Sequence, residues 1–243
     1  MIKEAMEYFR RLVDESAEVK EVEIDGKKYL NKEMHRYGKK DLAVKFEINT
    51  LTGIVDYIKG RPEELQETMI LRIDSPTRID FFSGLLEERK RETLLSSVAI
   101  VNQFKFDEYY DQERFLIELQ ANFIETDDLK IIMKVAGNVQ AGTTANYDDD
   151  GVSQKTTIKQ GVQRNDVLIP NPVVLMPYRT FSEVSQPISK YVFRVTEKNG
   201  TPFFKLVEAD NGLWKINAMK NIKYFLEYDL RDELEKYNIT IIA

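Results

Sequence analysis

The sequence contains no cysteine, and His35 is the only histidine among its 243 residues. The lack of cysteine excludes disulfide bonds, thiolate nucleophiles, iron–sulfur clusters and every cysteine-based zinc site. One chain cannot form a two-histidine metal site, and a Ser-His-Asp triad would have to use His35. Any catalysis would therefore depend on carboxylates, lysine, tyrosine or a hard metal ion. We expect a protein that binds rather than catalyses and that carries no cofactor.

The sequence also lacks a basic excess and a long apolar run. Its formal net charge is −6 and its pI is about 5.2. Proteins that bind nucleic acid regardless of sequence usually neutralise phosphates with many basic residues, so we expect no general nucleic-acid binding and leave open a local basic groove. No segment approaches the length of a membrane span, and residues 1–4 lack the apolar stretch of a signal peptide. We therefore expect a soluble, cytoplasmic protein with no membrane partner.

The chain has ample material for a packed core. Hydrophobic residues make up 42% of it, including 12 tyrosines and 13 phenylalanines. We find no internal repeat and no linker rich in proline, glycine or serine. We expect a single domain over residues 1–243 and leave open that residues 1–40 form an arm.

The first half of the sequence alternates between helical and strand patterns. Ile2, Met6, Phe9 and Val13 share one face of an expected amphipathic helix over residues 1–19. Asp25-Gly26 predicts a two-residue hairpin. We expect strands at 42–48, 69–73 and 78–82. We also expect three helices: one capped by Thr50 or Asn49 that ends at Gly60, one at 109–123, and one from Asp127 to about 138. The charged run 87–92 is either a helix face or, as we favour, the tip of a hairpin that returns over 94–101.

From residue 140 onward the pattern is mostly that of strands. Strands are expected at 152–159, 167–169, 173–176, 191–196, 203–207 and 239–242, and a helix near 214–229. Together these elements predict an α+β fold, with antiparallel β-sheets flanking a central helical pair and an amphipathic helix at the N-terminus.

Residues 176–187 do not suit a regular helix or a central strand. Pro177 and Pro187 lack a backbone donor and restrict the residue before them, which indicates an ordered, irregular connection. Such a connection presents its polar side chains at fixed positions. We therefore select a set of candidate ligand-binding residues from this connection and from the strand that follows it: Tyr178, Arg179, Glu183, Gln186 and Arg194.

Two interpretations of these residues stay open. Arg179 and Arg194 have the forked guanidinium that suits phosphate or carboxylate, and the aromatic neighbours of Arg194, Tyr191 and Phe193, would suit stacking against a nucleobase. The conservative alternative is that Arg179 binds backbone carbonyls or pairs with Glu183, because an irregular segment needs satisfied polar groups. The same two interpretations apply to Gln186.

Other candidate groups have an ordinary structural explanation beside the functional one. Asp148, Asp149 and Asp150 offer oxygen ligands for Mg²⁺ or Ca²⁺, but their spacing departs from that of an EF-hand loop, and adjacent acids often lie in solvated turns. Glu113 and Glu118 are five residues apart on an expected helix and so do not share a face well. We expect Trp214, which follows a turn, to anchor a core.

Several motifs of the sequence resemble the YfdQ-like family of phage and prophage proteins. The motifs are Val167–Pro172, Leu175–Val184 and Gln186–Ser189, together with Asp149–Gly151 and Gln154, Asp111–Phe115, and Glu208–Gly212 with Trp214. The resemblance covers roughly residues 40–230 and is most specific in the second half of the chain. The function of that family is uncharacterised. The resemblance implies a phage or prophage origin and provides no catalytic residue.

These observations lead to a first hypothesis about function. We expect a non-enzymatic, self-associating phage protein in the cytoplasm of the infected host cell, where it captures a small phosphorylated ligand such as a host defence signal. Two alternatives come from other classes of protein. One is a self-assembling shell or scaffold subunit, and the other is an accessory protein in phage DNA replication or recombination, with single-stranded nucleic acid as its partner.

Overall fold

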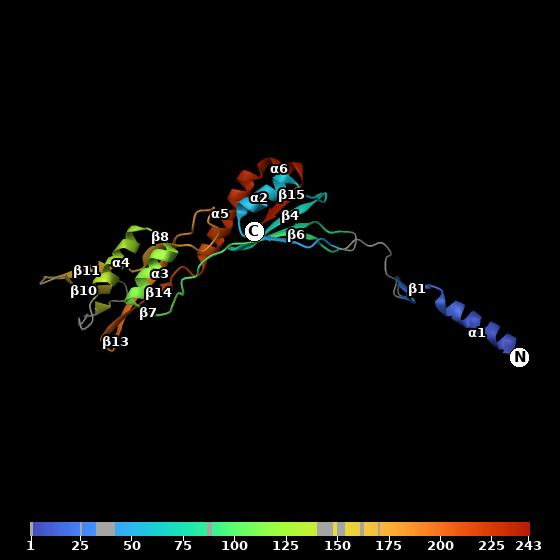
Figure 1. Ribbon diagram of the computed structural model, residues 1–243, viewed down its shortest axis with the longest axis horizontal. Coiled ribbons are helices and arrows are strands. Elements are labelled where there is room, and N and C mark those ends of the chain that lie inside the picture. Colours follow the sequence, from blue (N-terminus) through green and yellow to red (C-terminus); the bar gives the residue numbers. More distant parts are fainter. Residues whose placement is uncertain are drawn as a thin grey trace. The chain divides into compact units, whose positions relative to one another are not determined.

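The structure is a computed structural model that describes residues 2–24, 26–32, 42–86, 89–139, 148–149, 154–160, 163–169 and 171–243. The chain divides into two units, Met1–Leu42 and Ala43–Ala243. Helices and sheets are both present in quantity, so the expected α+β class is confirmed (Figure 1). Of the helices within the described ranges, none has both the length and the apolarity needed to cross a lipid bilayer.

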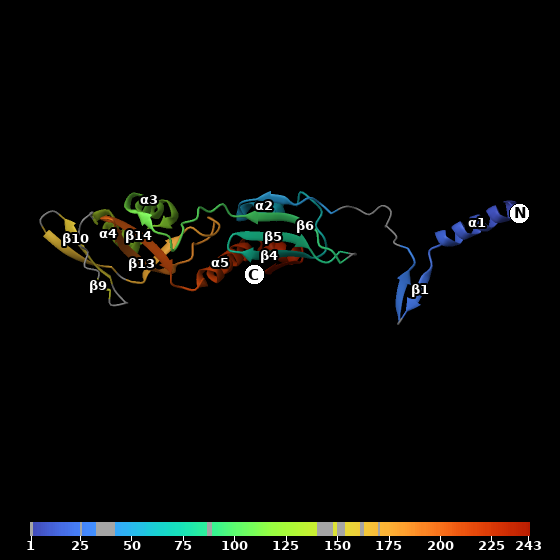
Figure 2. The same cartoon turned by 90° about the horizontal axis from the view of Figure 1, so that it is seen from below.

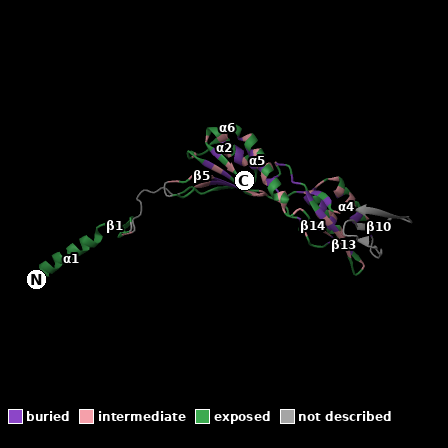
Figure 3. Ribbon diagram, turned by 180° about the vertical axis from the view of Figure 1, so that it is seen from behind, coloured by how far each residue is buried: buried purple, intermediate pink, exposed green. Residues whose placement is uncertain are grey.

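The N-terminal unit consists of one helix and one hairpin, as the sequence predicts. Helix α1 spans Ile2–Ala17, and strands β1 (Glu21–Ile24) and β2 (Lys27–Leu30) pair antiparallel. The Asn31 side chain connects the two parts, because it accepts a hydrogen bond from Lys20 N at 2.8 Å and donates one to Glu18 O at 3.0 Å. No described residue of this unit is buried, as the exposure colours of Figure 3 show.

The second unit contains two lobes, each with its own sheet and core. The first lobe has a five-stranded sheet in the order β15-β4-β5-β6-β3, and Figure 2 shows β4, β5 and β6 side by side. Its strands are β3 (Phe46–Ile48), β4 (Met69–Ser75), β5 (Arg78–Ser83), β6 (Thr93–Val98) and β15 (Ile239–Ile242). The two edge strands β15 and β3 pair parallel with their neighbours, whereas the inner pairs are antiparallel.

Three helices cover one face of this sheet. They are α2 (Leu51–Gly60), α5 (Leu213–Asp229) and the short α6 (Arg231–Lys236), which the sequence pattern did not predict. Apolar side chains of α2 and α5, such as Ile58 and Leu226, share a core with Leu71 and Phe81 of the sheet, and all four are 0–1% exposed. Burial of this kind stabilises the lobe by about 25 cal/mol for each Å² of apolar surface removed from water.

The predicted limits of α2 are confirmed. The hydroxyl of Thr50 accepts a hydrogen bond from Gly53 N at 3.1 Å and caps the first turn. The helix ends at Gly60, but the residue in the left-handed conformation is Arg61, with φ of 44°. The Arg61 guanidinium lies 4.3 Å from the centre of the Tyr237 ring, a contact that the expectation of a glycine stop did not foresee.

The second lobe is built on a sheet of order β7-β14-β13-β12-β8. Its strands are β7 (Tyr110–Asp111), β8 (Phe123–Ile124), β12 (Val173–Pro177), β13 (Ser189–Lys198) and β14 (Thr201–Glu208). Helices α3 (Gln112–Asn122) and α4 (Asp127–Asn138) pack on it, and α4 begins at the predicted acidic pair after the cap Thr126. The Phe115 ring of α3 stacks on Phe204 of β14 with 5.3 Å between the ring centres. A small third sheet contains β9 (Asp148–Asp149), β10 (Gln154–Gln160) and β11 (Gln163–Ile169).

The connection between β12 and β13 joins the two lobes. Both strands belong to the second sheet, yet Phe181 and Val184 between them are buried in the core of the first lobe. The Thr180 hydroxyl donates to Pro76 O in the β4–β5 turn, and Asn221 of α5 donates to Ser185 O at 2.8 Å. The irregular segment of the sequence is therefore a strap, residues 178–188, that leaves one sheet, packs into the other core and returns.

Some expected boundaries differ from the structure. The strand expected at 42–48 begins only at Phe46, because the preceding backbone bonds elsewhere: Ala43 N donates to the Glu92 carboxylate at 2.7 Å. The helix expected from residue 109 begins at Gln112, since Tyr110 pairs with Phe204 as part of β7 and Asp111 caps the helix. The expectation of one domain over residues 1–243 stays a prediction.

Candidate functional site

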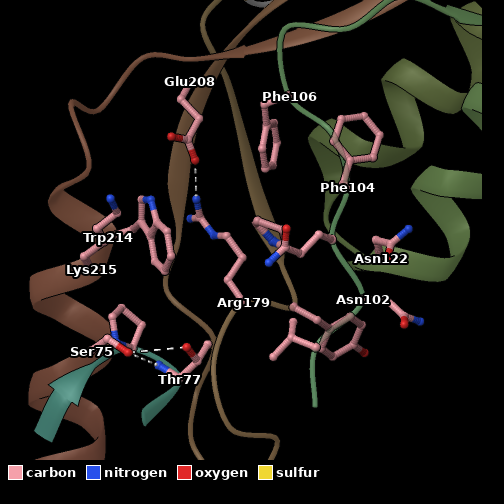
Figure 4. A pocket seen from close by; sticks show the side chains of 15 residues that line it. Ser75, Thr77, Asn102, Phe104, Phe106, Asn122, Arg179, Glu208, Trp214 and Lys215 are labelled. Atoms are coloured by element: carbon pink, nitrogen blue, oxygen red, sulfur yellow. Dashed lines mark hydrogen bonds and ion pairs between the residues drawn. The ribbon is translucent and has the colours of Figure 1, made fainter. Parts of the chain in front are cut away.

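A pocket of about 410 Å³ opens where the strap meets both lobes (Figure 4). The β4–β5 turn, the 101–106 segment that leads from the first lobe to the second, the end of α3, the strap and the start of α5 all contribute to its wall. The lining residues are Ser75, Pro76, Thr77, Val101, Asn102, Gln103, Phe104, Phe106, Asn122, Pro177, Tyr178, Arg179, Glu208, Trp214 and Lys215. Two of the five predicted ligand-binding residues, Tyr178 and Arg179, are among them.

Arg179 lies at the centre of this wall and is 8% exposed. Its Nη1 forms an ion pair with Glu208 Oε1 at 2.7 Å, and its Nη2 donates to the Ser189 hydroxyl. Ser189 in turn donates to the Asp210 carboxylate. Both terminal nitrogens of the guanidinium are thus engaged by groups of the protein. The expected partners, Glu183 or backbone carbonyls, are replaced by Glu208 and Ser189.

Two aromatic surfaces enclose the Arg179 guanidinium. The guanidinium carbon lies 4.0 Å from the centre of the Trp214 ring and 5.9 Å from that of the Tyr191 ring. In Figure 4 the side chain lies between Trp214 on one side and Phe104 and Phe106 on the other. Such cation–π contacts hold a guanidinium in place and allow its burial beside apolar rings.

Gln186 holds the strap in its irregular conformation. Its Oε1 accepts hydrogen bonds from Arg179 N at 2.8 Å and Thr180 N at 3.2 Å, and its Nε2 donates to Phe181 O at 2.9 Å. The side chain is 6% exposed. Because it satisfies backbone groups that lie outside any helix or sheet, it orients Arg179 rather than facing the pocket.

Glu183 and Arg194 lie away from the pocket. The Glu183 carboxylate accepts hydrogen bonds from Leu51 N at 2.7 Å and Thr52 N at 3.3 Å, so it binds the positive N-terminal end of α2. Arg194 alternates with the buried Tyr191, Phe193 and Val195 on β13 and so points to the opposite face of the sheet. The structure does not bring Arg194 together with Arg179, and the aromatic neighbours that suggested base stacking face the core.

Trp214 lines the pocket, although the sequence pattern predicted a different role for it. We expected it to anchor a core, but it is only partly buried and lines the pocket at the start of α5. Its position depends on the turn before it, where Asp210 Oδ1 accepts from Gly212 N at 3.1 Å and Gly212 adopts φ of 75°. The one signal in the sequence was the Asp210-Asn211-Gly212 turn, which does not show what the following ring contacts.

Four buried side-chain polar atoms within the described part of the chain have no hydrogen-bond partner. They are Asn122 Oδ1, Arg179 Nε, Tyr191 OH and Trp214 Nε1. Three of the four residues line the pocket, and the fourth, Tyr191, contacts the Arg179 guanidinium. The Asn122 amide is oriented by two acceptors of Glu118 at 3.0 and 2.7 Å, which leaves its oxygen free. An unpartnered buried polar group costs about 1–3 kcal/mol, so the three on the pocket residues Asn122, Arg179 and Trp214 indicate polar partners supplied from the pocket.

Burial also changes the proton affinities of two groups here. It is the largest influence on Arg179 and lowers the pKa of the guanidinium, although Glu208 acts in the opposite direction. Burial likewise raises the pKa of the Tyr191 hydroxyl above its ordinary value of 10.0. Arginine stays protonated despite such a shift, so the site contains a fixed cation, a carboxylate and a neutral phenol at neutral pH.

The candidate metal and carboxylate groups do not add to the pocket. In the parts of the chain that the structure describes, no three acidic or histidine side chains gather as a metal site would require. Asp148 and Asp149 form β9, and their side chains, like Asp150 and His35, lie outside the described residues. Glu118 accepts a hydrogen bond from Asn122, whereas Glu113 is exposed on α3.

The chain matches no protein-family model, no curated protein and no solved structure. The resemblance to the YfdQ-like family therefore stays a prediction, and the pocket is interpreted from its own residues.

Proposed function

We propose that this chain is a binding protein that captures a small nucleotide-like ligand in the pocket between strap and lobes. The observation that carries this proposal is the group of buried, unpartnered polar atoms on the pocket residues Asn122, Arg179 and Trp214. They comprise donors and an acceptor among aromatic rings, and a planar molecule with both kinds of group on its edge complements them. A nucleobase is such a molecule.

The shape and lining of the pocket support a flat ligand. Tyr178 is 44% exposed and free to stack, and Phe104, Phe106 and Trp214 supply further aromatic surface. Exposed amides at Asn102 and Gln103 and hydroxyls at the β4–β5 turn add hydrogen-bonding groups around the rim. A volume of about 410 Å³ suits a nucleoside-sized molecule and lies within the ordinary range of small-ligand sites.

The cation that would contact a phosphate is Lys215 rather than Arg179. Both terminal nitrogens of Arg179 are engaged by Glu208 and Ser189, so its charge is largely compensated within the protein. Lys215 lies on the first turn of α5 with its ammonium 5.9 Å from the centre of the Trp214 ring. A ligand whose base stacks on the aromatic rings would place its phosphate toward this ammonium.

The same geometry favours binding over turnover. The Glu208 carboxylate forms an ion pair with Arg179 at 2.7 Å, so it is already engaged by a partner within the protein. With the resemblance to a prophage family, capture of a phosphorylated host signal inside an infected cell remains our preferred biological role. Single-stranded nucleic acid is less favoured, because the pocket is a local site and Arg194, the second arginine of that hypothesis, lies on another face.

Trp214 provides the measurement, because it is the only tryptophan of the chain and lines the pocket. We would titrate the purified protein with nucleosides, nucleotides and inorganic phosphate, and follow tryptophan emission and the midpoint of thermal unfolding. We expect a nucleoside or nucleotide to change both, with a midpoint that rises with ligand concentration. No change with any base, nucleoside or nucleotide would overturn the proposal, as would an equal response to phosphate alone.

Matched variants locate the ligand. Tyr178→Ala is expected to weaken binding by about 5- to 100-fold through lost stacking, whereas Tyr224→Ala, an aromatic on α5 that is 69% exposed, is expected to leave it unchanged. Lys215→Ala should weaken nucleotide binding and spare nucleoside binding, with Lys220→Ala on the same helix as control. Equal effects of Tyr178→Ala and Tyr224→Ala would place the ligand elsewhere.

A further inference from the structure

Helix α1 has an apolar stripe that no other described residue of its own unit, Met1–Leu42, covers. Ile2, Met6, Phe9 and Val13 recur at spacings of four, three and four residues, and they are 81%, 69%, 68% and 60% exposed. No residue of α1 is buried. A lone helix of 16 residues is marginally stable in water, so a helix with this pattern depends on a partner for its stability.

The β1–β2 hairpin also has an exposed apolar face. Val22 pairs with Tyr29 and Ile24 with Lys27, so Val22, Ile24 and Tyr29 lie on one face, and these three are 48–55% exposed. An isolated two-stranded hairpin is also marginally stable. Because the Asn31 side chain bonds the end of the helix to the base of the hairpin, both apolar surfaces belong to one small element without a core of its own.

The charges of this element point to a second copy as its partner. Residues 1–42 contain ten basic and ten acidic side chains, so two copies approach without net repulsion. Helices that bind membrane surfaces carry a polar face rich in lysine and arginine, whereas α1 has three basic and four acidic residues. Basic and acidic side chains follow one another at a spacing of four residues in α1, as Lys3 and Glu7 or Arg10 and Asp14 do. The charges on the polar face of the helix therefore compensate one another within one helix.

We propose that the unit Met1–Leu42 is a self-association element, in which α1 pairs in parallel with α1 of a second copy. Lys3 and Arg10 flank one edge of the stripe, and Ala5 and Leu12 flank the other. Antiparallel pairing would place the basic edge against itself. Parallel pairing places it against the apolar edge, where the aliphatic stem of Arg10 covers Ala5 of the other copy.

The stripe is short, which limits the strength of the expected association. Sixteen residues extend over roughly 24 Å and give two heptads, so the hairpin face must contribute to the paired surface as well. We therefore expect association that depends on protein concentration rather than a permanent dimer. This inference does not depend on the ligand proposed for the pocket.

Sedimentation or light scattering of the full chain over a range of concentrations tests the pairing. We expect the mass to rise toward twice that of one chain, and Phe9→Asp to keep the protein monomeric. Tyr8→Asp changes an adjacent aromatic that is 60% exposed but lies off the stripe, and it is expected to associate like the native chain. Unchanged Trp214 emission in both variants would show that the second unit is intact. A monomeric native chain, or association that survives Phe9→Asp, would overturn the proposal.

Cysteine cross-linking tests the direction, because the chain has no cysteine of its own. Ser16 continues the spacing of the stripe, so in a parallel pair Ser16→Cys faces its own copy and forms a disulfide under mild oxidation. Glu7→Cys, on the polar side, should cross-link far less. If Ser16→Cys fails to cross-link with itself but does so with an Ile2→Cys chain, the helices are antiparallel and the proposal is wrong. If the chain is monomeric and binds neutral or anionic lipid vesicles in a manner that depends on Phe9, the partner of the stripe is a membrane surface and the proposal is wrong.

Discussion

The guanidinium carbon of Arg179 lies 4.0 Å from the centre of the Trp214 ring, although 34 residues separate them in the sequence. The arginine belongs to the strap, and the tryptophan lies in the first turn of α5. The contact places a cation against the indole, while Glu208 and Ser189 hold the other side of the guanidinium. Arg179 thus joins the strap to both β13–β14 and α5, and its removal should affect the fold as well as the pocket.

Arg179→Met tests that role, because methionine keeps much of the length but removes the charge and all donors. We expect it to lower the free energy of unfolding by about 2–4 kcal/mol, since Glu208 and Ser189 lose a charged partner inside the protein. Urea unfolding measures the change, and the Trp214 emission of the folded state should shift because its cation is gone. Lys190→Met, an exposed change on β13, should stay within about 0.5 kcal/mol of the native chain. Equal effects of the two changes would contradict the role.

Local patterns in the sequence predicted local structure well. The 4-3-4 spacing of Ile2, Met6, Phe9 and Val13 predicts α1, and Asp127-Asp128 marks the start of α4, because each signal lies within the element it specifies. Residues 178–187 were correctly expected to be ordered and irregular, whereas Met176 and Pro177, which were expected to share that character, belong to strand β12. Such patterns depend on periodicity and on backbone donors, which neighbouring residues alone determine.

The pocket could be predicted only in part, since it depends on contacts between distant residues. Glu183 binds the start of α2 across 132 positions, and Thr180 bonds Pro76 across 104, so the strap owes its place to partners that no local pattern reveals. Arg194 illustrates the same limit. Its aromatic neighbours in sequence alternate to the other face of the strand, so proximity along the chain did not mean proximity in space.

Gln186→Met should loosen the strap. Methionine has a similar size but cannot bond Arg179 N, Thr180 N or Phe181 O, which would be left buried without partners. We expect the free energy of unfolding to fall by about 2–4 kcal/mol, and amide hydrogens of the strap to exchange faster than those of β13. Chemical unfolding and hydrogen exchange measure both effects. Ser182→Ala, at an exposed position of the same strap, is the control and should change neither. Exchange rates in the strap that match the native chain would show that Gln186 does not hold it.

Asp80 on β5 should make the first lobe sensitive to acid. Its buried carboxylate accepts hydrogen bonds from Arg72 at 2.9 Å, Arg78 at 3.1 Å and Ser96 at 2.8 Å. Burial acts to raise the pKa of Asp80, but these three donors outweigh it and hold the pKa below its ordinary value of 3.8. Because the folded pKa is the lower one, the stabilisation is complete above the unfolded value and is lost as the pH falls through the folded pKa.

Asp80→Asn tests this dependence. Unfolding by urea at several pH values between 7 and 2.5 should show that the native chain loses stability below about pH 4, and that the variant, already less stable at pH 7, loses less over the same interval. Asp74→Asn is the matched control, because Asp74 also contacts Arg72, at 3.3 Å, but its side chain is 46% exposed. Water and salt screen such an exposed pair, so its loss should leave the acid dependence almost unchanged. If Asp80→Asn and the native chain lose stability in parallel below pH 4, the network around Asp80 is not the source of the acid sensitivity.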